Sequence, residues 1–133
     1  MSSIPASIPL AIELHPAQIV GTGGAIGALC RHYVSKWVDS EDFPSGTFTV
    51  NAIGSFVLAS IAFLGINHEF MLLLGTGACG SFTTFSSFSF ETVRLWETGA
   101  PTRAAINAGG NLIGAVLAIG LAWALTRLVM TVV

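Results

Sequence analysis

Residues 75–91 read GTGACGSFTTFSSFSFE, and no other part of the chain combines glycines, phenylalanines and hydroxyl side chains in this way. Three glycines fall within residues 75–80, where each weakens a helix by about 1 kcal/mol relative to alanine. Phenylalanine then recurs every third residue, at Phe82, Phe85 and Phe88, with serines and threonines between. What such a stretch forms depends on the solvent around it, so the rest of the chain decides its interpretation.

The composition fits a protein that lies in a membrane. Of the 133 residues, 53% are hydrophobic and only 9% are charged, and the mean hydropathy is +0.77. Average soluble domains carry about 25% charged residues, so this chain has too few charges to cover a soluble surface. The net charge of −2 gives no basis for nucleic-acid binding. The composition therefore predicts an integral membrane protein.

Four apolar segments of the chain predict membrane helices. We predict one transmembrane domain with a short N-terminal tail at residues 1–16 and helices at about 17–37, 47–66, 70–96 and 104–126. Residues 47–66 carry no charge and match the roughly 20 residues that cross about 30 Å of hydrocarbon. A β-barrel would need alternating apolar and polar residues, which these segments lack. The fold class expected is all-α, an integral membrane four-helix subunit with a broken third helix.

Three asparagines lie within these apolar segments. Asn51 is early in the second helix, and Asn107 and Asn111 are four residues apart on one face of the fourth. An amide in hydrocarbon costs free energy unless it finds partners. Each asparagine taken singly fits an interhelical hydrogen bond. Three of them in two helices favour a polar lining for an ion path.

The third helix carries two kinds of group that could act on ions. Its phenylalanine ring edges bear partial positive charge and can favour an anion weakly, which suits conduction better than tight binding. Its hydroxyls outnumber those needed to bond back to the preceding turn. Should the glycines open the helix at Gly77 to Gly80, the freed carbonyl oxygens would suit a small cation. The spacing of the phenylalanines also fits ordinary core packing.

The same residues resemble a known family. The third-helix stretch GSFTTFSSFSFETV, the upstream TVNAIGSF and the first-helix GGAIGALCRHYV are similar to the Fluc (CrcB) family of fluoride ion channels, from about Gly21 to the fourth helix. The resemblance implies an antiparallel (inverted) dimer of four-helix subunits in the cell membrane, with two fluoride pathways. It also implies a central sodium ion that is structural and is not transported.

The resemblance assigns roles to particular residues. Asn51, Phe85 and Phe88 match the fluoride pathway, Gly80 and Thr83 match the positions whose backbone carbonyls hold sodium, and Arg31 matches the arginine that closes the first-helix motif. Beside them we expect the following residues to line the pathway: Ser86, Ser87, Ser89, Asn107 and Asn111. The two asparagines of the fourth helix depart from the family, which often has a tyrosine followed four residues later by a serine.

The function expected is passive fluoride export through the membrane, with fluoride and lipid as partners and without catalysis. One alternative is a proton-coupled exporter of small cations, which needs a carboxylate deep in the bundle; Glu13 and Glu91 instead lie near predicted helix ends. Another is a non-transporting assembly subunit in which the polar residues only join helices.

The composition of the dimer stays open between two arrangements. If the termini share one side of the membrane, four cationic residues lie toward the other side and Arg127 alone lies with the termini. A subunit that inserts in both orientations should have little such bias. The dimer is therefore either a homodimer or a heterodimer with an oppositely oriented homologous subunit.

Overall fold

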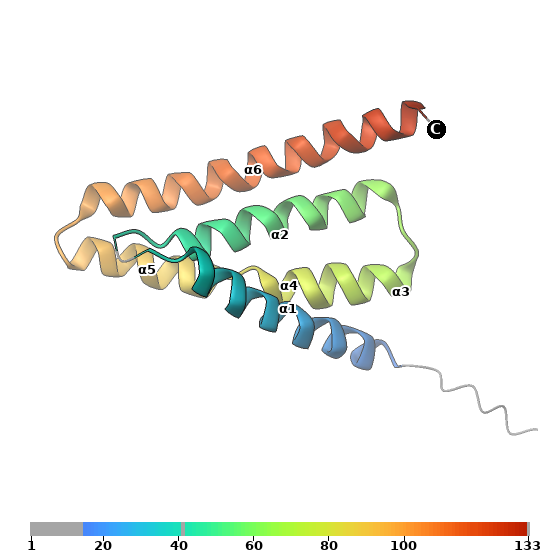
Figure 1. Ribbon diagram of the computed structural model, residues 1–133, viewed down its shortest axis with the longest axis horizontal. Helices are drawn as coiled ribbons and strands as arrows, with labels where there is room; N and C mark the ends of the chain where they lie inside the picture. Colours follow the sequence, from blue (N-terminus) through green and yellow to red (C-terminus); the bar gives the residue numbers. More distant parts are fainter. Residues whose placement is uncertain (1–14, 41, 133) are drawn as a thin grey trace, which may run out of the picture.

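The structure is a computed structural model that describes residues 15–40 and 42–132, and every regular element in this part is helical (Figure 1). The elements are α1 (Pro16–Val38), α2 (Ser45–Leu64), α3 (His68–Phe70), η1 (Met71–Cys79), α4 (Gly80–Phe82), α5 (Phe85–Glu97) and α6 (Pro101–Val132). From α3 to α5 the elements follow one another as a single broken third helix. The described residues thus form four helical segments, which confirms the predicted all-α class with a broken third helix. Residues 1–14 of the predicted tail lie outside the described part.

Two of the helices have the length and composition of membrane spans. They are α2, with 20 residues and a mean hydropathy of 1.8, and α6, with 32 residues and a mean hydropathy of 2.0. The structure ends α2 at Gly65, whose φ of +64° is the left-handed conformation that commonly closes a helix. It begins α6 at Pro101. A proline suits the first turn of a helix, because N–H groups there have no partner within the helix and proline has no N–H to leave unpaired. α6 is thus longer at both ends than the predicted 104–126.

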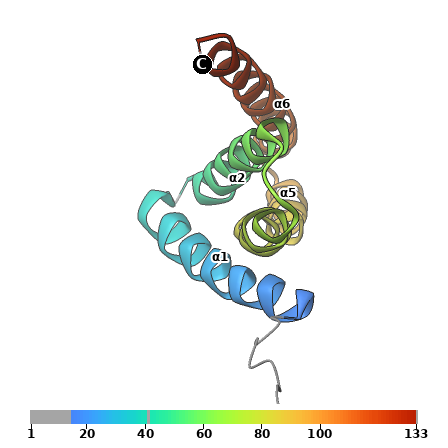
Figure 2. The same cartoon turned by 90° about the vertical axis from the view of Figure 1, so that its right-hand side faces the viewer.

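α1 crosses the third helix so closely that the two backbones touch. Figure 2 shows α1 running diagonally across the end-on view of the other helices. Gly23 and Gly27 are buried, and a Cβ atom on either would collide with the carbonyl of Leu73 or Ala78. On the other side of the contact, a Cβ at Gly77 would lie 2.7 Å from the Val20 carbonyl oxygen. The glycines of both helices therefore serve close packing.

The position of the helix break differs from the prediction. Residues 71–79 form a π-helix, and Gly80 has helical φ and ψ of −62° and −32°, so the glycine run does not open the helix. The chain leaves the helical conformation at Thr83, with ψ of 158°, and at Thr84, with φ of −147° and ψ of 116°. The opening considered at Gly77 to Gly80 therefore does not occur, and the helix breaks at Thr83 and Thr84. Gly77 is needed for contact with α1, whereas the break is fixed by side-chain hydrogen bonds around Thr84.

α6 packs on α2 and α5 and leaves most of its apolar surface outside the subunit (Figure 1). Within the described residues, the largest side chains that are completely buried are those of Val50 in α2 and Asn107 in α6. A fully buried asparagine in place of an apolar side chain shows that the centre of this contact is polar. The fold thus brings the α2 and α6 asparagines to the same level as the break in the third helix.

Candidate functional site

Asn51 of α2 holds the helix break through the backbone of Thr84. Its Oδ1 accepts from the Thr84 N–H at 2.8 Å, and its Nδ2 donates to the Thr84 carbonyl oxygen at 3.1 Å. The side-chain amide of Asn51 therefore bonds to both the N–H and the carbonyl of Thr84, as the backbone of a paired β-strand would. Gly54, one turn further along α2, is buried against Thr83 and Phe82 and gives the break room to approach α2.

Thr84 fixes the start of α5 on the other side of the break. Its side chain is buried, and its Oγ1 accepts from the Ser87 N–H at 3.1 Å, which is the usual N-cap bond. The same oxygen donates to Ser87 Oγ at 3.1 Å and lies 3.3 Å from Ser86 Oγ. The hydroxyls of Ser86 and Ser87 thus gather at the first turn of α5, where the helix dipole favours negative charge.

The three asparagines form one line of hydrogen bonds. Asn51 Nδ2 donates to Asn111 Oδ1 at 3.1 Å, and Asn111 Nδ2 donates to the backbone and side-chain oxygens of Asn107 at 3.0 and 3.1 Å. Asn107 Nδ2 then donates to Thr92 Oγ1 at 2.9 Å, and that hydroxyl donates to the Phe88 carbonyl at 2.7 Å. Both N–H groups of Asn51 and both of Asn111 are therefore engaged by the protein.

An open cavity of about 530 Å³ lies beside the break, between α2, α5 and α6. Its lining residues are Asn51, Gly54, Ser55, Leu58, Thr83, Thr84, Phe85, Phe88, Ala108, Asn111, Leu112 and Ala115. The rings of Phe85 and Phe88 lie 5.6 Å apart at 47°, and Phe85 is 79% exposed within the subunit. The cavity combines aromatic rings, amides and hydroxyls with a mostly apolar wall.

A polar hollow of about 340 Å³ lies toward the loop end of the same helices, with both acidic and basic residues in its wall. Arg103 Nη1 donates to the Asp42 carbonyl at 3.1 Å across this hollow. Glu91 lies deeper, where its Oε1 accepts from Thr47 Oγ1 at 2.7 Å. Its Oε2 is buried and has no hydrogen-bond partner among the described residues. The third helix therefore carries polar groups from the break to its loop end.

The residues of the chain match a known family over most of its length. Residues 18–123 fit the family described as CrcB-like protein, Camphor Resistance (CrcB). The chain belongs to the CrcB-like family. Its helical fold and its two long apolar helices make this CrcB-like chain a membrane protein.

Curated relatives of this CrcB-like chain carry names that state an activity. Fluoride-specific ion channel FluC 2 of Haloarcula marismortui is 58% identical over 89% of this chain and 99% of the relative. Fluoride-specific ion channel FluC 1 of Halobacterium salinarum is 50% identical over 83% of this chain and 92% of the relative. The FluC of Oceanobacillus iheyensis is 42% identical over 84% of this chain and 89% of the relative. The similarity covers the helices that build the cavity.

The structure brings some of the predicted site residues of this CrcB-like chain together and leaves others apart. Thr83, Phe85 and Phe88 line the cavity with Asn51 and Asn111. The remaining predicted residues are not in its wall: Asn107 lies behind Asn111, Ser86 and Ser87 lie at the α5 N-cap, Ser89 is half-buried further along α5, Gly80 is in α4, and Arg31 is half-buried on α1. The sequence predictions for these residues stay predictions.

Two residues with clear roles in the geometry were not predicted. Thr84 is the N-cap of α5, and Thr92 continues the asparagine line. Thr84 could have been found, because a threonine immediately before a new helical stretch is a common N-cap. Thr92 could not, since only the packing of α5 against α6 brings its hydroxyl to Asn107.

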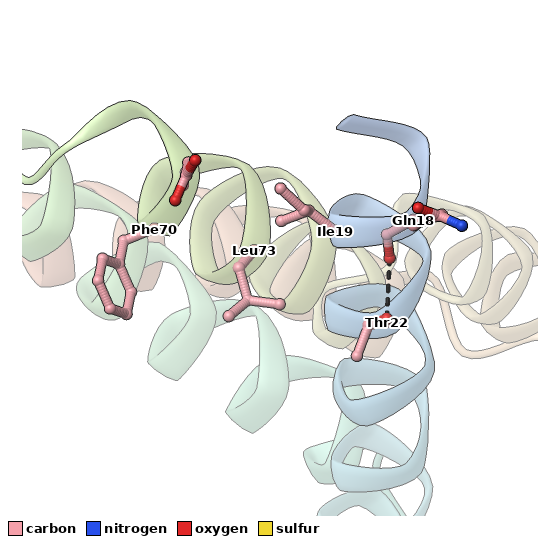
Figure 3. Close-up of a pocket in the computed structure, with 6 residues that line it drawn as sticks. Gln18, Ile19, Thr22, Phe70 and Leu73 are labelled. Atoms are coloured by element: carbon pink, nitrogen blue, oxygen red, sulfur yellow. Dashed lines mark hydrogen bonds between the residues drawn. The ribbon is translucent and has the colours of Figure 1, made fainter. Parts of the chain in front are cut away.

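A separate apolar pocket of about 320 Å³ lies between the start of α1 and the start of the third helix (Figure 3). Its wall is formed by Gln18, Ile19, Thr22, Glu69, Phe70 and Leu73. The Thr22 hydroxyl turns back to the Gln18 carbonyl at 2.8 Å, so it offers no free donor to the pocket. This pocket contains none of the residues predicted to act on ions.

Proposed function

We propose that this chain forms a fluoride-selective channel, which lets fluoride leave the cell down its electrochemical gradient. The observation that carries the proposal is the cavity beside the break, whose wall brings the rings of Phe85 and Phe88 together with amides and hydroxyls. The relatives from Haloarcula marismortui and Halobacterium salinarum, whose names state fluoride-specific channels, support the choice of ion. Passive export of this kind would lower cytoplasmic fluoride and requires no catalysis.

The chemistry of the cavity suits an anion that has to pass through. Ring edges attract an anion weakly because their charge is only partial, and hydroxyls can replace part of its hydration shell. The break starts a new helix at Phe85, whose first N–H groups and dipole also favour negative charge. Such groups bind an anion enough to admit it and too weakly to trap it.

The proposal includes an inverted dimer in the cell membrane, in which each subunit crosses the membrane several times. Phe85 is 79% exposed in the single subunit, so the pathway would be completed by a second copy or by an oppositely oriented homologue. Fluoride would then pass at the contact between subunits.

A structural sodium ion at this contact is a further part of the proposal, held by the carbonyls of Gly80 and Thr83. In a continuous helix those carbonyls would accept from the N–H groups of Thr84 and Ser87, four residues later. Here Asn51 Oδ1 takes the first N–H at 2.8 Å, and Thr84 Oγ1 takes the second at 3.1 Å. Carbonyls released at the end of a half-helix are the groups that hold sodium in membrane proteins, so these two positions fit the ion.

Fluoride efflux from liposomes holding the purified protein, recorded with a fluoride electrode, tests the proposed function. We expect the parent protein to release fluoride and to exclude chloride. Phe85→Ile and Phe88→Ile should each lower the rate by about tenfold or more, because an aliphatic side chain has no positive ring edge. Phe90→Ile, an exposed phenylalanine of α5 outside the cavity, is the matched control and should keep the parental rate.

An inert parent protein in a verified dimeric state would overturn the proposal. Efflux of protons or organic cations in place of fluoride would indicate the exporter alternative. Unchanged fluoride sensitivity of a deletion strain that regains this chain would indicate the non-transporting subunit.

A further inference from the structure

We infer that Asn51 is a positioning residue for the cation site, because it keeps the Gly80 carbonyl out of the helical hydrogen-bond ladder. The inference rests on the proposed sodium site and adds a coupling between that site and the fluoride cavity. Asn51 lies in the wall of the cavity, and its amide holds the break. One side chain therefore takes part in both proposed sites.

The Thr84 N–H has two possible acceptors, the Gly80 carbonyl of a continued helix and the side chain of Asn51. Gly80 has helical φ and ψ, and α4 continues to Phe82, so a change of Thr83 from its extended to a helical conformation would extend the turn by one more bond. That bond would join the Thr84 N–H to the Gly80 carbonyl. The Thr84 N–H instead donates to Asn51 Oδ1 at 2.8 Å. Each N–H makes one strong bond, so the acceptor on Asn51 competes directly with the Gly80 carbonyl.

The remaining contacts of Asn51 fix its acceptor in place. Its Nδ2 donates to the Thr84 carbonyl and to Asn111 Oδ1, both at 3.1 Å, so the Oδ1 atom is the one that faces the Thr84 N–H. An unpaired polar group in the membrane interior costs free energy, so the Thr84 N–H needs some acceptor. If Asn51 loses its acceptor, the acceptor that a continued helix would offer is the carbonyl that the proposed sodium ion would need.

The test measures the thermal unfolding of the purified channel as Na⁺ replaces K⁺ at constant ionic strength. Anything that binds only the folded state raises its unfolding temperature with concentration. The parent should show a Na⁺-dependent rise in Tm. We define the Na⁺ midpoint as the Na⁺ concentration that gives half of the parent's rise in Tm. Asn51→Leu has a similar shape and no acceptor, and its Na⁺ midpoint should be about tenfold higher. The reason is that a helical hydrogen bond competing for the Gly80 carbonyl would weaken Na⁺ binding by about this factor. Asn51→Asp keeps an acceptor for the Thr84 N–H and adds a negative charge that itself attracts a cation, so its Na⁺ midpoint should not rise above the parental one.

Three further variants keep the result interpretable. Ser55→Ala alters the wall of the same cavity but touches no hydrogen-bond partner of Asn51, so its Na⁺ midpoint should stay parental. Ser60→Ala removes a hydroxyl from α2 that bonds only to the Phe56 carbonyl, and it controls for loss of a polar group in that helix. If Asn51→Leu does not fold, Asn51→Ser serves instead, since a serine is too short to reach Thr84 and can bond to its own helix.

The outcomes separate this inference from the proposed function. A Na⁺ midpoint that is parental in Asn51→Leu or Asn51→Ser overturns the inference, while fluoride efflux by the parent can still stand. An equal fall in Tm at every Na⁺ concentration shows a purely structural role for Asn51 and also overturns it. If the parent conducts fluoride but its Tm does not rise with Na⁺, both the proposed cation site and this inference are overturned.

Discussion

At the scale of single residues, the asparagines beside the break are hydrogen-bonded to one another and to neighbouring threonines. Asn107 is the clearest case. Its side chain is 0% exposed, it accepts from Asn111 at 3.1 Å and it donates to Thr92 at 2.9 Å. A buried amide with partners on both sides stabilises the contact between α5 and α6 and fixes the orientation of Asn111 toward the cavity.

Asn107→Leu is therefore expected to destabilise the fold. The substitution removes the acceptor of Asn111 and the donor to Thr92, and each polar group left unpaired in the interior costs about 1–3 kcal/mol. Thermal or denaturant unfolding of the purified protein measures the change. Thr131→Val is the control, since its hydroxyl bonds only within the exposed end of α6. Equal stability of the two variants would show that the asparagine line does not hold α5 to α6.

At the scale of elements, the third helix is divided into two parts with different tasks. Gly77 in its first part lies against the backbone of α1, and its second part begins at the Thr84 cap. α2 serves both, since Gly54 admits the break and Asn51 holds it. Close backbone packing of this kind is typical of membrane helices with small residues at the interface.

Gly27→Ala is expected to weaken the contact between α1 and the third helix. The new Cβ atom would collide with the backbone carbonyl of Ala78, which cannot move as a flexible side chain would, and overpacking typically costs about 1–3 kcal/mol. The unfolding temperature should fall accordingly. Gly21→Ala lies in the same helix with nothing within 4 Å of the new Cβ, so it should be neutral or stabilising by up to about 1 kcal/mol. Equal effects of the two changes would contradict the close contact.

At the scale of the whole molecule, one subunit leaves its functional surface open. The cavity beside the break is open, and Phe85 projects from its wall with 79% of its surface exposed. Exposure of a phenylalanine to lipid carries no free-energy penalty. A passage for ions, however, needs protein walls on every side. A second subunit is the component that the proposed channel lacks.

Native mass spectrometry of the purified channel is expected to find a species of twice the 13.8 kDa of one chain. Phe85→Arg should reduce the share of that species, because a charge without a partner would be buried at the subunit contact. Trp37→Arg changes an 89% exposed aromatic at the end of α1, and it should leave the dimer intact. Single chains under every condition in which fluoride efflux persists would contradict the dimer.

Much of the architecture could be predicted from the sequence because hydropathy and backbone pairing act locally. Apolar length and the absence of charge located α2 and α6, and glycine and proline marked several ends. The sequence could not place the break, because a glycine can mark either a flexible point or close packing. Which of the two applies depends on the helix that packs against it. Gly77 is buried against α1 and stays helical, whereas Thr83 and Thr84 are extended.

The sequence by itself determined that this chain is a helical membrane protein of the CrcB-like family, since composition, periodicity and motif order are properties of residues near one another along the chain. Only the tertiary structure decided where the third helix breaks and which polar groups meet. Asn51 and Thr84 are distant in sequence, and their bond of 2.8 Å exists because α2 packs against the third helix at the level of Gly54. Hydrogen bonds between distant segments depend on packing, which no local pattern encodes.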